Sequence, residues 1–190
     1  MFRLRRYYLI LIKNTLYNMS NNCVLQGTLI QLENDETKEI ELLKVGEKLL
    51  SYSIEGIENT QKRHLLGKTK VNEFEGEFSY QLIKNIWENT FESYYKINNE
   101  LSITEDHYVL CKRNDEYYWI QVESLKIGDL LFKLDNTFKI IESLQRIEEE
   151  KTVYNLQVNS IYTFFANGYL VHNGSANCPN EDDCEACYDA

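Results

Sequence analysis

Apolar and polar residues alternate over short stretches along most of this chain, a pattern typical of half-buried β-strands. The stretches richest in β-branched and aromatic residues span residues 28–32, 94–97, 107–110, 117–120 and 152–158. Polar turn segments separate them, at residues 34–36, 98–100, 114–116 and 134–136. Residues 81–90 fit either a turn of helix or a twisted strand, and no longer stretch shows a helical apolar stripe. The pattern therefore predicts an all-β fold.

A repeated pattern within the chain indicates an internal duplication. Residues 40–49 and 122–131 both read apolar, acidic, any residue, Leu, Lys, β-branched, Gly, acidic, any residue, Leu. The glycine of each copy, Gly46 or Gly128, would allow a tight turn at positive φ, which a β-carbon disfavours. Two related halves would form one pseudo-two-fold β domain and bring its two ends together.

Composition limits the kind of protein. A chain of 190 residues with 43% hydrophobic content can form one domain with a real core and short tails. The net charge of −10 argues against a nucleic-acid binder, because phosphate contacts require clustered lysine and arginine. The cysteine count is odd, with Cys23 and Cys111 far from a group at residues 178–187. This favours a reducing intracellular compartment over a disulfide-stapled secreted fold.

The first residues give only a weak targeting signal. Three arginines precede the apolar run at residues 7–12, which is far shorter than the ~20 residues needed to cross a bilayer. No small-residue cleavage site follows the run. We therefore expect no membrane partner and interpret residues 1–22 as an N-terminal flank. Met19 is an alternative start to Met1.

Two motifs near the ends of the chain carry residues suited to cutting the chain itself. Cys23 leads into an alternating strand, and its thiol could attack the peptide bond just before it. His172 and Asn173 end another strand immediately before Gly174. The Asn173 amide could attack its own carbonyl and release Gly174. A domain that cleaves at its own two boundaries needs this pair of groups.

Each candidate residue taken alone also has a structural explanation. Free cysteine is among the most buried residue types, so Cys23 alone would indicate a core thiol, and the same holds for Cys111. His107 begins an apolar stretch and alone would indicate a hydrogen-bonded core histidine. Asn-Gly is the commonest turn dipeptide. His64, in a charged segment, is expected in a solvated loop. Only the order and combination of these residues favour the chemical interpretation.

Three blocks in order resemble the hedgehog/intein (Hint) superfamily of self-processing domains. The first runs from Cys23 to Ser53, and the second ends in the pattern Thr104-x-x-His107. The third comprises residues 153–158 and 163–173 and ends in His172-Asn173. The resemblance implies a Hint domain at residues 23–173, with a horseshoe-like β fold and internal pseudo-two-fold duplication. Residues 174–190 then form a short acidic, cysteine-containing tail.

The resemblance also implies a role for each candidate residue. Cys23 would take the acyl group of Asn22 from nitrogen to sulfur, and His107 would protonate the departing nitrogen. Thr104 would hydrogen-bond the same peptide or orient that imidazole. Asn173 would cyclise while His172 protonates the leaving amine. The reaction would be a single-turnover cleavage in cis, with the flanking segments as substrate. It would take place in a monomer and need no cofactor or metal.

Some positions depart from the family pattern. Splicing inteins carry Cys, Ser or Thr after the terminal Asn, whereas here Gly174 follows and Ser175 comes one residue too late. Cleavage with at most residual splicing is therefore expected, because position strongly affects intramolecular reactions. Asn155 stands where many inteins have Asp, and it cannot hold a charge. Tyr162 replaces a common histidine, which predicts slow C-terminal cleavage. The pattern resembles bacterial intein-like and polymorphic-toxin Hint groups.

Two alternatives stay open. The chain could be a catalytically inactive Hint scaffold that serves as a β-rich structural or binding module. Alternatively, Cys23, His107 and His172 could form a zinc site with help from the tail cysteines, Cys178, Cys184 and Cys187. A tail without a metal is the simpler interpretation, because a convincing fourth ligand for a zinc knuckle is missing there.

Overall fold

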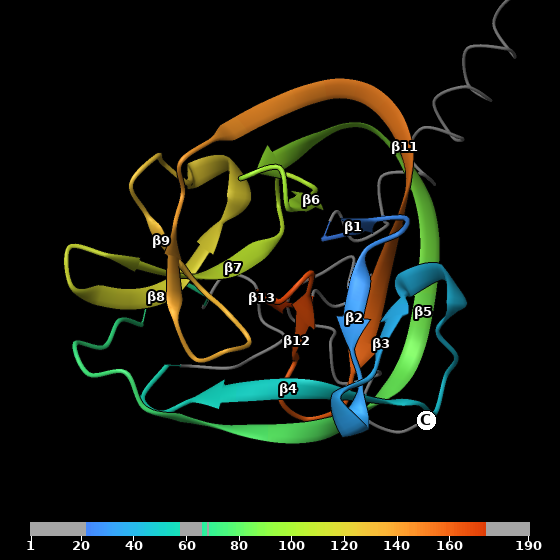
Figure 1. Ribbon diagram of the computed structural model, residues 1–190, viewed down its shortest axis with the longest axis horizontal. Coiled ribbons are helices and arrows are strands. Elements are labelled where there is room, and N and C mark those ends of the chain that lie inside the picture. Colours follow the sequence, from blue (N-terminus) through green and yellow to red (C-terminus); the bar gives the residue numbers. More distant parts are fainter. Residues whose placement is uncertain (1–21, 58–65, 68, 174–190) are drawn as a thin grey trace, which may run out of the picture. The chain divides into compact units, whose positions relative to one another are not determined.

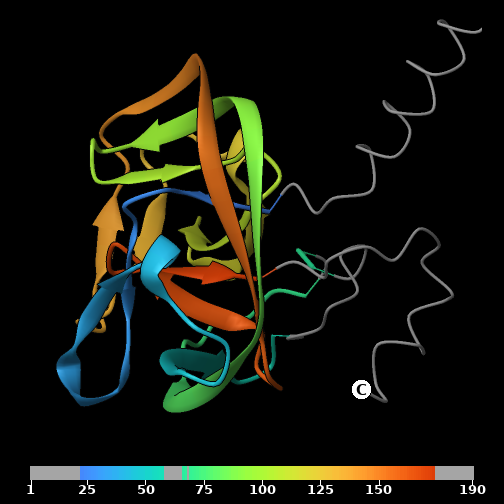
Figure 2. The same ribbon diagram turned by 90° about the vertical axis from the view of Figure 1, so that its right-hand side faces the viewer.

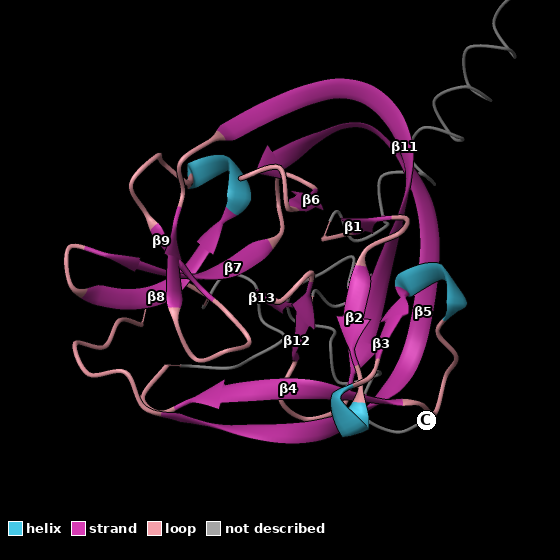
Figure 3. Ribbon diagram, viewed as in Figure 1, coloured by secondary structure: helices cyan, strands magenta, loops and turns pink. Residues whose placement is uncertain are grey.

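The computed structural model describes residues 22–57, 66–67 and 69–173, and Figure 1 shows how their strands are arranged. The strands are β1 (Val24–Leu25), β2 (Leu29–Gln31), β3 (Thr37–Glu39), β4 (Lys48–Ile54), β5 (Gly76–Ile97), β6 (Leu101–Ile103), β7 (Tyr108–Arg113), β8 (Glu116–Gln121), β9 (Leu130–Phe132), β10 (Phe138–Ile140), β11 (Leu144–Val158), β12 (Thr163–Ala166) and β13 (Tyr169–His172). Within these ranges the helical segments are short 3-10 turns, η1 (Glu33–Asp35), η2 (Ile40–Leu42) and η4 (Val122–Ser124). The predicted all-β fold is confirmed (Figure 3).

Two long antiparallel strands, β5 and β11, form the frame of the first sheet. They pair from Leu144 opposite Ile97 to Val158 opposite Ile83, with irregularities after Glu148 and Gln157. Such irregularities bend a strand and increase its twist. The first residues of β5 extend past β11 and pair with β4 instead, and both long strands curve (Figure 2). Residues 81–90, which fitted either a helical turn or a strand, therefore belong to one strand of 22 residues.

The strand order places the two ends of the described chain inside sheets. In the first sheet the order is β11-β1-β6-β5-β4, so β1 lies between β11 and β6. In the second sheet the order is β10-β9-β7-β13-β12-β2-β3, with β8 pairing with β7. The final strand, β13, therefore lies between β7 and β12. Both ends are held by neighbouring strands on two sides.

The two copies of the repeated pattern adopt the same local structure. Each begins with a 3-10 turn, η2 or η4, and continues into a turn at a glycine with positive φ. The φ angles are +91° at Gly46 and +96° at Gly128, which confirms both predicted turns. Each glycine N–H donates a 2.9 Å hydrogen bond to an isoleucine carbonyl, that of Ile83 or Ile141. Duplication of the whole domain stays a prediction that this local match supports.

Apolar side chains from both sheets pack into separate hydrophobic clusters. The main cluster includes fully buried residues of β1, β2, β6, β7, β12 and β13. A second cluster is aromatic, with the Phe74 and Phe132 rings 4.8 Å apart. Cys111 is fully buried in the main cluster, as expected of a core thiol. Burial raises the pKa of the Cys111 thiol to about 12, so this cysteine is a poor nucleophile near neutral pH.

Candidate functional site

Cys23 and Thr104 are joined by hydrogen bonds at the start of β1. The backbone N–H of Cys23 donates to the Thr104 hydroxyl at 2.8 Å. That hydroxyl donates to the Cys23 carbonyl at 3.1 Å, and the Thr104 backbone N–H donates to the same carbonyl at 3.0 Å. Cys23 is 2% exposed and Thr104 is fully buried. The Thr104 hydroxyl is therefore next to the nitrogen of the Asn22–Cys23 peptide bond.

A tight turn links Thr104 to His107. The His107 backbone N–H donates to the Thr104 carbonyl at 3.2 Å, which closes the turn over residues 104–107. The His107 carbonyl in turn accepts a hydrogen bond from the N–H of Val122 at 2.9 Å. The imidazole is fully buried, and its ring centroid lies 6.3 Å from that of Phe164. We call this segment the Thr104–His107 turn. Cys23 is hydrogen-bonded to its first residue, and His107 is its last residue.

Strand β13 leads the other end of the described chain to the same turn. His172 pairs with Tyr108 of β7 and with Thr163 of β12. The β7 register, continued by one residue, places Asn173 opposite His107. The Asn173 backbone N–H donates to the carbonyl of Tyr162 at 2.8 Å, and Asn173 is fully buried. Cys23 and Asn173, far apart in sequence, therefore both adjoin the Thr104–His107 turn.

His172 lies on a different face from its neighbour. Successive strand residues point to opposite faces of a sheet, so the side chains of His172 and Asn173 diverge. The His172 ring contacts Trp119 edge-on, with centroids 5.2 Å apart, and lies 6.4 Å from the ring of Tyr162. His172 is 1% exposed. Its imidazole therefore lies on the face opposite to the side chain of Asn173 and not in one pocket with that of His107.

Of the two aromatic neighbours of His172, the sequence indicated Tyr162 as part of the site but not Trp119. Trp119 is 2% exposed, and its indole N–H has no hydrogen-bond partner within the described ranges. Tyr162 has a φ of +58°, which is uncommon for an aromatic residue and stores backbone strain. This conformation aims its carbonyl at the N–H of Asn173. Trp119 lies in β8, and aromatic residues in strands usually indicate a core, so only the fold could reveal its place beside His172.

Asn155 is a further polar residue at the site, placed there by strand pairing. In β11, Tyr154 and Val153 pair with Val24 and Leu25 of β1. Continued by one residue, this register places Asn155 opposite Cys23. Asn155 is 2% exposed, and neither atom of its side-chain amide has a hydrogen-bond partner in the described part of the chain. An unsatisfied buried polar group costs about 1–3 kcal/mol, so Asn155 is a candidate site residue that the register places beside Cys23.

Other candidate sites receive no support. Among the described residues, no group of three or more His, Cys, Asp and Glu side chains is arranged to hold a metal ion. That finding gives no support to a zinc site at Cys23, His107 and His172, while His64 and the tail cysteines lie outside the described residues. The helices in the described ranges include none long and apolar enough to span a membrane.

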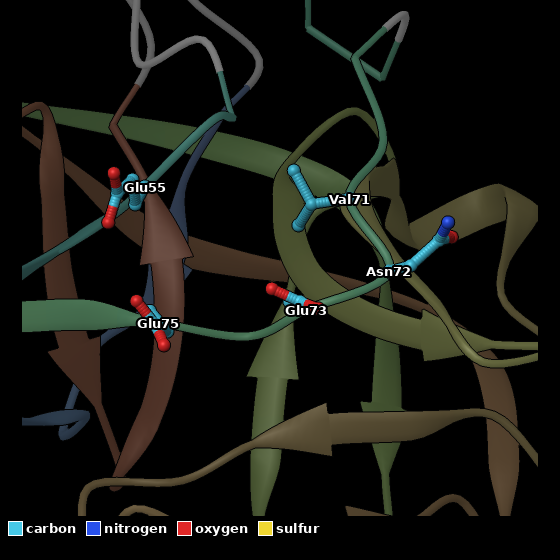
Figure 4. Close-up of a pocket in the computed structure, with 5 residues that line it drawn as sticks. All are labelled: Glu55, Val71, Asn72, Glu73 and Glu75. Atoms are coloured by element: carbon cyan, nitrogen blue, oxygen red, sulfur yellow. The ribbon is translucent and has the colours of Figure 1, made fainter.

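An acidic cavity of about 430 Å³ opens elsewhere, between the end of β4 and the start of β5 (Figure 4). Its lining residues are Glu55, Val71, Asn72, Glu73 and Glu75. None of the candidate residues contributes to this lining. A group of carboxylates around an apolar valine offers neither a nucleophile nor an imidazole, so the cavity is not the reacting centre.

The arrangement around the Thr104–His107 turn suits acyl transfer. It combines a thiol, a hydroxyl hydrogen-bonded to the adjoining peptide nitrogen, a buried imidazole and a terminal carboxamide. In chemical terms, such groups can serve as a nucleophile, a positioning group, a proton donor and a second nucleophile in peptide-bond cleavage. Burial of the whole set restricts the access of water.

Comparisons with known proteins agree with this geometry at the level of the fold. No family model matches the sequence, and no curated protein matches it. A bacterial intein-like domain from Clostridium thermocellum has a TM-score of 0.62 at 20% identity, over 81% of this chain and 100% of that one. A DnaB intein from Synechocystis sp. PCC 6803 has a TM-score of 0.58 at 15% identity, over 81% and 99%. The TvoVMA intein has a TM-score of 0.62 at 14% sequence identity, over 81% of this chain and 99% of that one. The described residues have the intein, or Hint, fold.

Proposed function

We propose that this chain, which has the intein fold, is a self-processing domain that cleaves the peptide bonds at its own two boundaries. The observation that carries the proposal is that Cys23 and Asn173 adjoin the two ends of the Thr104–His107 turn in a buried setting, Cys23 at Thr104 and Asn173 opposite His107. The cleaved bonds are Asn22–Cys23 and Asn173–Gly174. The substrate is the flanking chain itself, so each molecule reacts once at each boundary.

At the first boundary the reaction is an acyl shift from nitrogen to sulfur. The Cys23 thiol loses its proton and attacks the carbonyl carbon of Asn22. A carbon–sulfur bond forms, and the carbon–nitrogen bond to Cys23 breaks as His107 supplies a proton to that nitrogen. The Thr104 hydroxyl, at 2.8 Å from the same nitrogen, holds the peptide in position. The product is a thioester, which lacks the resonance stabilisation of a peptide bond.

At the second boundary the reaction is cyclisation of Asn173. Its side-chain nitrogen attacks its own carbonyl carbon and forms a five-membered imide, and the bond to Gly174 breaks. The nitrogen of Gly174 takes up a proton, which His172 supplies. The hydrogen bond from the Asn173 N–H to the Tyr162 carbonyl fixes the backbone during ring closure. Gly174 has no side chain to accept an acyl group, so release of the flanks is expected instead of splicing.

The proposal is tested by measuring the intact mass of the purified full-length chain over time, with and without dithiothreitol. Fragments corresponding to residues 1–22, 23–173 and 174–190 are expected. Thiol should speed release of the first fragment, because it attacks a thioester. If only the full-length mass persists under both conditions, the proposal is wrong and an inactive scaffold is the remaining interpretation.

Replacing Thr104 by valine should slow release of residues 1–22 by roughly tenfold or more. Valine keeps the β-branched shape but removes the hydroxyl that binds the Cys23 N–H. Loss of a buried hydrogen-bond partner costs about 1–3 kcal/mol, and each 1.36 kcal/mol in the barrier changes a rate about tenfold. Thr104→Ser should restore most of the rate. If intact mass shows equal rates for Thr104→Val and the unmodified chain, Thr104 has no role in the first cleavage.

A further inference from the structure

Both proposed cleavage bonds follow an asparagine. Asn22 precedes the Cys23 nitrogen just as Asn173 precedes the Gly174 nitrogen, and both asparagines are fully buried. The nucleophile in ring closure at Asn173 is a side-chain amide whose own backbone carbonyl holds the reacting carbon. Asn22 meets the same requirement, because its carbonyl carbon is the one that Cys23 attacks. The first boundary therefore contains a second internal nucleophile.

A thioester at Cys23 is resolved when a nucleophile accepts its acyl group. The boundary at Asn173–Gly174 does not offer such a nucleophile. Gly174 has no side-chain nucleophile. Water or the low thiol concentration of an ordinary solution reaches such a site slowly, because Cys23 is 2% exposed and Asn22 is fully buried, and only added dithiothreitol competes with an internal group. Effective concentrations for well-oriented intramolecular groups reach about 10⁵–10⁸ M, far above any external thiol. An internal acceptor is thus favoured over an external one.

We propose that the side-chain amide of Asn22 is the acceptor that resolves the thioester; this inference rests on the acyl shift proposed above. The Asn22 side-chain nitrogen attacks the thioester carbon, so a carbon–nitrogen bond forms and the carbon–sulfur bond breaks. The sulfur of Cys23 leaves as a thiolate, and the nitrogen's proton passes to it. The released segment ends in a cyclic imide, and Cys23 becomes a free N-terminal cysteine. No external co-reactant is consumed.

The order of the two steps matters for the prediction. Attack on the intact peptide bond would have to overcome amide resonance and expel an amine. Attack on the thioester expels a thiolate, which can leave without first gaining a proton, because a thiol is far more acidic than the N–H of a neutral amine. The nitrogen of a peptide bond has to be protonated before it can leave. Cys23 therefore acts first and Asn22 second. The released segment carries a chemical mark of this route, namely its cyclic end.

The experiment compares the unmodified full-length chain with Asn22→Gln and Asn22→Ala, with and without dithiothreitol, by intact mass after an acid quench. Glutamine keeps the amide, but its ring would have six members and close more slowly, whereas alanine has no amide. Without thiol, the unmodified chain should release residues 1–22 at least roughly tenfold faster than either variant. Residues 1–22 released from the unmodified chain should be lighter by one water than the same segment with a C-terminal carboxyl group. After the imide hydrolyses, the segment should contain isoasparagine at its end. With thiol, all three should release the segment.

The outcomes separate this inference from the proposed function. If both variants release residues 1–22 without thiol as fast as the unmodified chain does, Asn22 is not the acceptor. The same conclusion follows if the fragment released from the unmodified chain ends in a free acid from the start. If the unmodified chain releases the segment only with thiol, the acyl shift stands and the inference is wrong. If no form releases it even with thiol, while cleavage at Asn173–Gly174 shows that the domain is folded, the acyl shift fails and the inference with it.

Discussion

Replacing Cys23 by alanine is expected to abolish release of residues 1–22, with or without dithiothreitol. Alanine has no nucleophile, so neither the thioester nor any later ring closure at Asn22 can follow. The measurement is the intact mass of the full-length protein over a day at neutral pH. Cleavage at Asn173–Gly174 should continue in this variant and show that the fold is intact, because Asn173 reacts with its own carbonyl.

Cys111→Ala is the matched control for that variant. Its thiol is also buried, but it lies in the main hydrophobic cluster, and burial raises its pKa to about 12. Both junctions should still be cleaved in Cys111→Ala, apart from a modest loss of stability from the cavity left in the core. Loss of N-terminal cleavage in Cys111→Ala but not in Cys23→Ala would contradict the assignment of the nucleophile.

Replacing Asn173 by alanine is expected to abolish release of residues 174–190. The alanine side chain cannot close the imide ring, and the buried setting restricts hydrolysis by water. Thiol-dependent release of residues 1–22 should persist, because Asn173 takes no part in forming the thioester. The mass of the C-terminal fragment reports the effect directly.

Asn173→Gln separates the chemistry from simple packing at this position. It retains a carboxamide but requires a six-membered ring, so it should also fail to release the tail within the same period. Release of residues 174–190 from either variant at the unmodified rate would show that the bond breaks by another route, and the cyclisation proposed for Asn173 would be wrong.

Much of the fold was predictable because local pattern and tertiary structure agree. The stretches at residues 107–110 and 117–120 alternate and contain β-branched and aromatic residues, and they lie in or directly before β7 and in β8. The turns at Gly46 and Gly128 were predictable because glycine readily adopts positive φ. The residues that the resemblance nominated, Cys23, Thr104, His107, His172 and Asn173, are all buried, and their roles stay a prediction.

The length and pairing of the longest strands were not predictable. Residues of β5 change partner from β4 to β11, and irregularities in the β5–β11 pairing interrupt the simple alternation of exposed and buried side chains. A strand of this kind has no single apolar period, so residues 81–90 were ambiguous. The places of Asn155 and Trp119 depend on register between distant strands. Register is a property of the assembled sheets and cannot be read from one segment.

The position of β1 also has a consequence during synthesis on the ribosome. Cys23 emerges early, but the strands on either side of β1 are β6, which begins at Leu101, and β11, which begins at Leu144. Translation proceeds at about 5–20 residues per second, so the thiol lacks its neighbours for several seconds. If the proposed acyl shift takes place, a segment attached before Cys23 therefore has time to fold before the shift can sever it.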